Sequence, residues 1–570
     1  MISLIQSLSP STTFYGLSSR PQSQALDWIL ADPFSAYGLS ADRLVQRFSL
    51  ATFWYSTNGA DWDHDGWLNS TNECDWDMDG IGCSPEFAVE RLDLSGDSLS
   101  GSMPIEVGLL TQLTRLDVSI NDLTGSIPSE CGLLTHLDQL WLDTNKLTGP
   151  IPSELSLLHQ TATSLAFYVN ELTGSIPSAL GLLTELTVLN LSNNQLTGPI
   201  PSELGLMDQL VSLVLRNNQL TGPIPSELSR MVLLQALYLY NNKLMGSIPS
   251  ELGLMDKLQL LDLNSNQLTG SLPSELGLMK QLLLLNLNNN QIMSSLPSEL
   301  GLMNQLQSLL LFNNELTGYI PSELGLMEQL LEVYLFNNQL TGSIPSEFGL
   351  MDQLQVLYLF NNKLTGSIPS ELGLMDQLLD LSLGNNTLSG SIPSELGLLV
   401  DLEGLYLYNN QLKGSLPSEL GLLNQLLKLS LGNNQLTGPI PSELGILVDL
   451  EGLFLFNNEL TGSIPSELGL LGQLLLLGLH KNQLKGSLPS ELGLLSQLLN
   501  LSLENNQLTG SLPSELGLLS QLSNLSLEGN ELTGSVPPSL CSGGLVSIHI
   551  DCGEIACTCC LEAWPSTMSC

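Results

Sequence analysis

The chain has few aromatic and few basic residues. Only 5% of its 570 residues are Phe, Trp or Tyr, whereas 43% are apolar, so the core must be mainly aliphatic. Lys and Arg total 16 against 57 Asp and Glu, which gives a formal net charge of −41 at pH 7. A surface that binds phosphate groups needs clustered Lys and Arg, so nucleic acid and anionic lipid headgroups are not expected partners.

Long apolar runs and grouped catalytic residues are also missing. No run of about 18 apolar residues occurs, so we expect no transmembrane segment in this chain. The five histidines are scattered, and none lies in a recognisable arrangement with a nucleophile and a carboxylate. We therefore expect a protein that is not an enzyme and that uses no metal or cofactor.

A repeat of 24 residues runs along most of the chain. One Asn returns in the same slot of each copy, from Asn121 and Asn145 onward to Asn530, with a single 25-residue step before Asn170. Asp97 occupies this slot in a degenerate first copy, which gives 19 coils. A strict period of this length is typical of solenoids, which grow along one axis.

Each copy predicts one coil of the solenoid. In the coil from Leu306 to Gln329, Leu309 and Leu311 alternate as in a β-strand. Asn314 is expected to turn inward, because its amide can bond backbone groups at a buried corner. Four further apolar residues are predicted to fill the interior of the coil, which returns through a second short strand: Leu316, Ile320, Leu324 and Leu326.

The repeated segment LxxLxLxxNxLTGxIPxxLGxL resembles the plant-type leucine-rich repeat, from about Val89 to Leu540. The flank DPFSAYGLSADRLVQRFSLATFWYSTNGADW, followed by GWLNSTNECDWDMDGIGC, is similar to the amino-terminal cap of secreted or cell-surface leucine-rich-repeat proteins of diatoms and related algae. The resemblance implies an α/β-type leucine-rich-repeat solenoid. This is a curved right-handed stack of about 19 coils, with a parallel β-sheet on the concave face and capped ends. It also implies a recognition or adhesion role, and it brings no active-site residues.

The repeat divides the chain into four expected parts. Residues 1–35 are expected to be a disordered leader, and 36–88 an amino-terminal cap. Residues 89–540 form the solenoid, and 541–570 a Cys-rich carboxy-terminal cap. The first residues lack a clear signal peptide, and relatives often carry an upstream membrane anchor, so an anchor before this sequence is left open.

Eight of the nine cysteines lie at the ends of the solenoid, where short flanks gain most from disulfides. We expect Cys74 to pair with Cys83 beside the first coil, and a buried free thiol at Cys131. Most of the six carboxy-terminal cysteines are expected to be bridged, with a zinc site in this cluster as the alternative: Cys541, Cys552, Cys557, Cys559, Cys560 and Cys570. Five sequons are candidate glycosylation sites and fit an extracellular or cell-surface protein: Asn69, Asn190, Asn385, Asn500 and Asn524.

Aromatic residues gather at the outward strand positions four and two residues before the repeated Asn. Large aromatic side chains exposed on a sheet can grip a ligand, so we predict that these residues form a binding site. The alternative is cross-strand pairing that only stiffens the sheet. The predicted ligand-binding residues are Tyr238, Tyr240, Phe312, Tyr334, Phe336, Tyr358, Phe360, Tyr406, Tyr408, Phe454 and Phe456.

Two acidic patterns have simpler explanations. Glu recurs once per coil in the segment PSEL, and such a row is expected to be a solvated edge that keeps the solenoid soluble. Asp75, Asp77, Asp79, Gly80 and Glu86 match the spacing of an EF-hand calcium loop. The flanking cysteines and Pro85 argue against an EF-hand, because they leave no room for its exit helix.

Two functions are compatible with this pattern. The first is a receptor-like recognition module that binds a peptide, protein or glycan on its concave face. The alternative is a structural, adhesive or ice-facing protein that uses the regular outer lattice of the repeats. Aromatic residues cluster in the central coils, whereas a lattice function needs uniform coils, so the first function is favoured.

Overall fold

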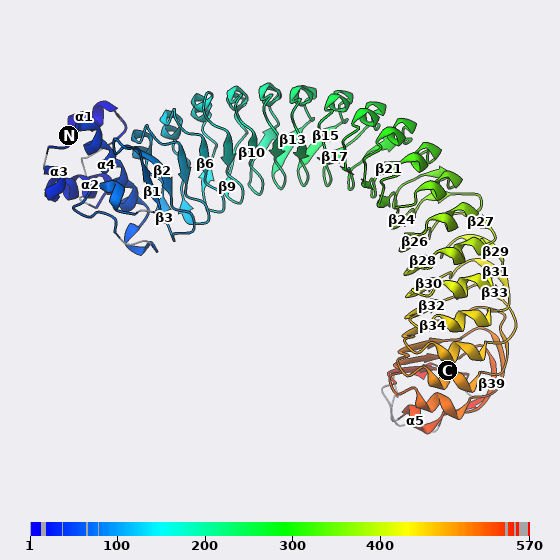
Figure 1. Cartoon of the computed structure of the whole chain (residues 1–570). Helices are drawn as coiled ribbons and strands as arrows, with labels where there is room; N and C mark the ends of the chain where they lie inside the picture. The colour runs from blue at the N-terminus through cyan, green and yellow to red at the C-terminus, as the bar shows by residue number, and fades with distance from the viewer. Residues whose placement is uncertain are drawn as a thin grey trace. The chain divides into compact units, whose positions relative to one another are not determined.

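The computed structural model describes residues 2–8, 10–12, 19–36, 38–63, 66–77, 79–541, 545–551, 554–557 and 568–569. The chain forms two compact units, Met1–Asn290 and Gln291–Cys570. Both consist of the predicted coils, each with a strand in a parallel sheet, a second short strand and a 3-10 helix (Figure 1). The predicted solenoid fold is therefore confirmed. No helix among the described residues is long and apolar enough to cross a membrane.

In the first unit, consecutive sheet strands pair in parallel from β2 to β18, and β1 pairs with β2 in the antiparallel direction. Equivalent Leu residues of consecutive strands are paired in register, as Leu92 is with Leu116. The strands of this sheet are β1 (Ile81–Cys83), β2 (Val89–Asp93), β4 (Arg115–Asp117), β6 (Gln139–Trp141), β8 (Ser164–Ala166), β10 (Val188–Asn190), β12 (Ser212–Val214), β14 (Ala236–Tyr238), β16 (Leu260–Asp262) and β18 (Leu284–Asn286).

The second unit repeats this arrangement without a change in register. Its sheet strands are β20 (Ser308–Leu310), β22 (Glu332–Tyr334), β24 (Val356–Tyr358), β26 (Asp380–Ser382), β28 (Gly404–Tyr406), β30 (Lys428–Ser430), β32 (Gly452–Phe454), β34 (Leu476–Gly478), β36 (Asn500–Ser502), β38 (Asn524–Ser526), β40 (Ser547–His549) and β42 (Met568–Ser569).

The predicted second strand is present on the return path of the coils. In the first unit these strands are β3 (Ser100–Ser102), β5 (Asp122–Thr124), β7 (Thr148–Gly149), β9 (Glu171–Leu172), β11 (Thr197–Pro199), β13 (Gln219–Gly222), β15 (Lys243–Gly246) and β17 (Gln267–Leu268). In the second unit they are β19 (Met293–Ser294), β21 (Glu315–Leu316), β23 (Thr341–Gly342), β25 (Lys363–Leu364), β27 (Ser389–Gly390), β29 (Gln411–Ser415), β31 (Gln435–Gly438), β33 (Glu459–Leu460), β35 (Lys485–Gly486), β37 (Gln507–Ser511), β39 (Glu531–Ser535) and β41 (Ile555–Ala556).

A 3-10 helix closes each coil except the last, which the short α5 (Pro538–Cys541) closes. In the first unit these helices are η3 (Ile105–Leu109), η4 (Ser129–Leu133), η5 (Ser153–Leu158), η6 (Ser178–Leu182), η7 (Ser202–Leu206), η8 (Ser226–Arg230), η9 (Ser250–Leu254) and η10 (Ser274–Leu278). In the second unit they are η11 (Ser298–Leu302), η12 (Ser322–Leu326), η13 (Ser346–Leu350), η14 (Ser370–Leu374), η15 (Ser394–Leu398), η16 (Ser418–Leu422), η17 (Ser442–Ile446), η18 (Ser466–Leu470), η19 (Ser490–Leu494) and η20 (Ser514–Leu518).

The inward Asn ladder is confirmed. Asn338 is 9% exposed, and its amide nitrogen donates to the carbonyl of Leu311 at 3.1 Å and to that of Leu335 at 3.0 Å. Its side-chain oxygen accepts the backbone N–H of Leu316 at 3.0 Å. One side chain thus joins backbone groups of two adjacent coils, and the same bonds recur at Asn362. Buried backbone groups at the corner are satisfied in this way.

The prediction is wrong for one of the four residues expected to fill the coil interior. Leu316, Ile320 and Leu324 are buried, but Leu326 is 56% exposed and Met327 is buried in its place. The cause is the 3-10 helix η12, in which residues three apart lie on the same side. Leu324 and Met327 share the inner side, so Leu326 falls on the outer side.

The amino-terminal cap is built on α4 (Ala41–Ser56), with α1 (Ile2–Leu8), α2 (Pro21–Ala31) and α3 (Pro33–Ala36) and the short η1 (Gly59–Asp61) and η2 (Glu73–Asp75). The Arg47 side chain is fully buried and pairs with Asp32 at 2.7 Å and with Glu73 at 3.0 Å. Burial of the Glu73 carboxyl opposes ionisation, but the hydrogen bonds that it accepts from Arg43, Gln46 and a backbone N–H, together with the positive charge of Arg43, outweigh burial and hold the Glu73 pKa below its usual value.

The expectation of a disordered leader over residues 1–35 is wrong for α2. Ala25 and Ile29 on this helix are buried against Phe48 and Ala51 of α4. The same segment ends at Asp32, whose carboxylate pairs with Arg47. The cap therefore begins earlier in the chain than residue 36.

The cysteines of the amino-terminal part follow the prediction. Cys74 and Cys83 form a disulfide, and Cys131 is a buried free thiol whose pKa burial raises to about 12. Cys557 is disulfide-bonded. Cys552, Cys559, Cys560 and Cys570 lie outside the described residues, as does the side chain of Cys541.

The acidic loop between Cys74 and Cys83 is part of this cap. Asp77 Oδ1 accepts the backbone N–H of Gly80 at 2.9 Å, and a turn over residues 84–88 followed by strand β2 occupies the place where an EF-hand needs its exit helix. This agrees with the argument from sequence against an EF-hand.

Candidate functional site

The predicted aromatic residues fall into both units. Tyr238 and Tyr240 lie in the first unit, where Arg216 lies 5.3 Å from the Tyr240 ring centroid and donates to its hydroxyl. The other nine lie in the second unit, at the ends of sheet strands or two residues beyond them. All eleven side chains are partly buried rather than fully exposed.

Five of them form one continuous cluster in the second unit, which we call the aromatic ladder: Phe312, Tyr334, Phe336, Tyr358 and Phe360. Phe336 stacks on Phe312 and on Phe360, with ring centroids 4.4 Å apart in both pairs. Tyr334 stacks on Tyr358 at 5.1 Å. Successive coils place equivalent side chains side by side, so the stacking follows from the register of β20, β22 and β24.

Tyr406, Tyr408, Phe454 and Phe456 alternate with coils that carry Ser and Gly at the same positions. A Cβ added at Gly384 would lie 2.7 Å from a ring carbon of Tyr408, and one at Gly432 would lie 2.7 Å from Phe456. These two rings therefore occupy space that the neighbouring glycines leave free. The alternation of aromatic residues and glycine was visible in the sequence, but sequence reasoning missed that the glycines make room for the rings.

Carboxylates border the aromatic ladder. Glu332 begins β22 and Asp380 begins β26. Burial, with Asp380 as the second cause, raises the pKa of Tyr358 to about 12, and burial and Glu332 raise the pKa of Tyr334. Both hydroxyls therefore stay protonated at neutral pH, and the ladder offers neutral hydrogen-bond donors in an acidic setting.

A second row of Asn residues, each one position before an inward Asn, runs beside the aromatic ladder, and sequence reasoning missed it. We call it the outer Asn row. Asn313, Asn337 and Asn361 have left-handed backbone angles with φ between +53° and +55°. Asn337 donates to Asn313 at 2.6 Å, and Asn361 donates to Asn337 at 2.6 Å. Asn tolerates this conformation better than other residues with a Cβ, which explains why the pair NN recurs.

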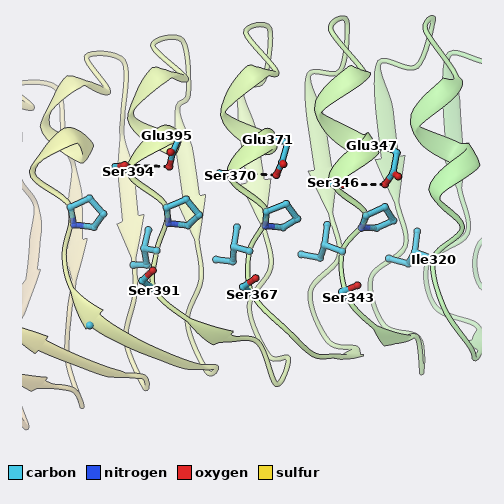
Figure 2. A pocket seen from close by; sticks show the side chains of 18 of the residues that line it. Ile320, Ser343, Ser346, Glu347, Ser367, Ser370, Glu371, Ser391, Ser394 and Glu395 are labelled. Carbon is cyan, nitrogen blue, oxygen red and sulfur yellow. Dashed lines mark hydrogen bonds between the residues drawn. The ribbon is translucent and has the colours of Figure 1, made fainter.

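A groove of about 1130 Å³ runs along the other side of the second unit, past the starts of the 3-10 helices. Figure 2 shows that the same set of side chains recurs in it from coil to coil, with Ser346 donating to Glu347 at 3.3 Å and Ser370 to Glu371 at 3.3 Å. Tyr319, 72% exposed, is one of its lining residues. The sequence signal for this residue was a single GYIP among repeated GSIP and GPIP segments.

The sequons lie mostly on the sheets. Asn190 ends β10, Asn500 begins β36 and Asn524 begins β38, and all three are partly buried. Asn385 accepts a hydrogen bond from Asn409 in the outer Asn row. Asn69 is exposed in the amino-terminal cap.

The repeats match the family model described as Leucine Rich Repeat. The matched residues are 185–207, 209–231, 233–255, 257–279, 305–327, 329–351, 353–375, 401–423, 425–447, 497–519 and 521–542. No curated protein matches the chain in sequence.

Several solved structures are similar over most of the chain. The plant peptide hormone receptor RGFR1 in complex with RGF2 is 32% identical, with 85% of this chain and 88% of that chain covered and a TM-score of 0.73. A TDR receptor is 31% identical, with 82% and 84% covered and a TM-score of 0.72. The Arabidopsis receptor kinase HAESA ectodomain, in complex with an extended IDA peptide hormone, is 30% identical, with 95% and 91% covered and a TM-score of 0.66.

Proposed function

We propose that this chain, which belongs to the leucine-rich-repeat family, is a non-catalytic recognition protein that binds a polypeptide through the aromatic ladder of its second unit. The observation that carries the proposal is the ladder itself, five stacked and partly exposed rings on one sheet face. Clustered aromatic residues dominate binding energy at many interfaces. Two of the three similar structures hold a peptide hormone, which supports a peptide ligand here.

The chemistry around the ladder supports the same class of ligand. The apolar rings suit aliphatic or aromatic side chains, and Glu332 and Asp380 at its border suit a basic side chain or a free amino group. The outer Asn row can bond the backbone of an extended segment, because each amide has two donor hydrogens and an acceptor oxygen.

An extracellular or cell-surface location belongs to the same proposal. The Cys74–Cys83 disulfide needs an oxidising compartment, and the flank that resembles the caps of diatom and algal proteins supports this location. We include in the proposal that the carboxy-terminal cysteines are mostly bridged and that the exposed sequon at Asn69 is glycosylated. The described parts of the amino-terminal cap, of 89–540 and of 541–570 would then be one secreted recognition module with two caps.

The test starts with a peptide and glycan array probed with the full chain. Changing Tyr334, Phe336, Tyr358 and Phe360 together to Ser should abolish binding of the selected ligand, since each anchoring aromatic contributes roughly 1–3 kcal/mol. The control changes Tyr319 of the same unit, which is 72% exposed in the groove on the other side, to Ser, and it should bind as the unchanged protein does.

Unchanged affinity in the four-residue variant would rule out this face. A large fall in its thermal stability without ligand would instead support the packing explanation. Selection of glycans alone would replace the polypeptide by a carbohydrate ligand.

A further inference from the structure

The outer side of the second unit carries a continuous row of exposed apolar side chains. We call it the outer stripe; it consists of the last residue of each 3-10 helix from η11 to η20. These residues are Leu, or Ile at position 446, and each is 52–62% exposed. The coil interior does not need them, because the residue that follows each is buried, as Met351 is after Leu350.

A row of glutamates runs parallel to the outer stripe. Each of the ten helices begins with Ser-Glu, so in η13 Glu347 precedes Leu350 by three residues. Residues three apart in a 3-10 helix lie on the same side, which places the two rows next to each other. A Cβ at Gly349 would lie 2.3 Å from the carbonyl oxygen of Glu371, so adjacent helices are in close backbone contact. This contact holds both rows at a fixed coil spacing.

The charge next to the outer stripe has one sign. None of the helices η11 to η20 contains Lys or Arg. Asp352 and Asp376 add carboxylates just beyond η13 and η14. Within the described part of the chain, these helix glutamates form no ion pair with a basic residue.

We propose that the outer stripe of the second unit binds a basic amphipathic segment of a partner protein. Its apolar side chains would cover the leucine row, and its Lys and Arg side chains would pair with the glutamate row. An anionic membrane and a second copy of this chain are poorer occupants, since both would bring like charge to this surface. The proposal does not depend on the aromatic ladder, which lies on different residues of each coil.

The exposed area is sufficient for such a contact. If burying a whole Leu side chain removes about 60–120 Å² from water, ten half-exposed ones offer on the order of 500 Å². The largest apolar patch on a typical monomer is about 300–600 Å² and is often functional. One side of a standard protein interface covers about 800 Å², so the neighbouring glutamates and serines would supply the remainder.

The first unit provides a natural comparison. Its 3-10 helices also end in exposed Leu, as at Leu206 and Leu254, but η8 between them ends in an exposed Arg230. A positive charge inside the row repels a basic segment and breaks the apolar surface. We therefore expect the second unit to bind more tightly than the first.

The experiment uses the full chain and a synthetic amphipathic helix with leucine on one face and lysine on the other. Binding is followed by fluorescence anisotropy at several salt concentrations. A helix with the same composition but scrambled faces, and one with Glu in place of Lys, serve as control probes. We expect binding of the first helix only, with affinity that falls as salt increases.

Changing Leu350, Leu374, Leu398 and Leu422 together to Gln should weaken that binding at least about tenfold, which is about 1.4 kcal/mol. Changing the glutamates of the same helices to Gln should flatten the salt dependence. The matched control changes Leu182, Leu206, Leu254 and Leu278 of the first unit to Gln and should have a much smaller effect.

Three results would overturn the proposal. The first is equal binding of the scrambled helix, which would indicate attraction by net charge alone. The second is unchanged affinity in the leucine variant of the second unit. The third is a dimer of the unchanged protein in sedimentation that the same variant abolishes, since this would assign the stripe to self-association. The four-residue aromatic variant should bind the helix normally, so failure of one proposal is separable from failure of the other.

Discussion

Replacing one ladder asparagine measures how much the inward amides stabilise a coil. Asn338 is a suitable choice because its two shorter carbonyl bonds, to Leu311 and Leu335, and the bond that it accepts from Leu316 are well defined. The Leu335 carbonyl also accepts from Asn362 at 3.0 Å, and the Leu311 carbonyl from Asn314 at 3.1 Å. The N–H of Leu316, in contrast, donates to Asn338 at 3.0 Å. In Asn338→Ala the two carbonyls therefore keep one partner each, and the Leu316 N–H loses the partner that the side chain supplied.

The expected cost follows from these bonds. A buried donor without a partner costs about 1–3 kcal/mol, and each of the two lost carbonyl bonds contributes about 1 kcal/mol. The variant should therefore lose about 3–5 kcal/mol. In a solenoid this loss falls on the coils that share the residue, rather than evenly along the chain. We expect faster hydrogen exchange in peptides that span residues 311–340, together with a lower urea midpoint.

Asn337→Gly is the matched control one residue away. Asn337 has φ of +53°, so glycine keeps the backbone conformation while it removes the outer amide and its bond to Asn313. This change should cost less than about 1 kcal/mol, because the outer amides can bond water instead. If Asn338→Ala lowers stability no more than Asn337→Gly does, the inward ladder is not what holds the corner of the coil.

Three further predictions concern packing, reactivity and pH. Gly349→Ala should destabilise the second unit by several kcal/mol, since its Cβ would meet the Glu371 backbone at 2.3 Å, whereas Gly472→Ala, with nothing within 4 Å, should be close to neutral in thermal melts. Cys131, whose pKa burial raises to about 12, should resist iodoacetamide at pH 8 until the chain is unfolded; rapid alkylation of the folded protein would contradict its burial. Because the pKa of Glu73 is lowered, its carboxylate stabilises the cap above about pH 4.3, and this contribution is lost as pH falls through the lowered pKa. During acid titration, the tryptophan fluorescence of the cap should therefore change before the circular dichroism of the repeats does.

The repeat made most of the fold predictable. Leucines at alternate positions indicate a strand, and the 24-residue spacing of Asn fixes where every corner lies. The structure confirms both, because the pattern and the backbone hydrogen bonds require the same register. The early helix α2 was missed, since Ala25 and Ile29 bury only when α4 is present to cover them.

The exposed leucines show where a repeat pattern is ambiguous. The segment from Leu324 to Met327 contains three large apolar residues, and composition alone assigns all of them to the core. Only the phase of η12 separates Leu324 and Met327, which are buried, from Leu326, which is not. That phase depends on close contact between helices of adjacent coils, which no single copy of the repeat reveals. The leucines of the outer stripe therefore cannot be told apart from core leucines in the sequence.

The positions of the aromatic residues were predictable, whereas the packing of the rings in the aromatic ladder was not. This packing bears on the class of ligand. Phe312, Phe336 and Phe360 cover one another's faces with planes 10–11° apart, so the middle ring presents mainly its edge to solvent. Sugars stack on ring faces, which are free here only at the ends of the stack. Ring edges carry partial positive charge and suit carbonyl oxygens and aliphatic side chains. With neutral Tyr334 and Tyr358 hydroxyls as donors and a row of amides alongside, the surface offers a polypeptide backbone more partners than it offers a sugar ring.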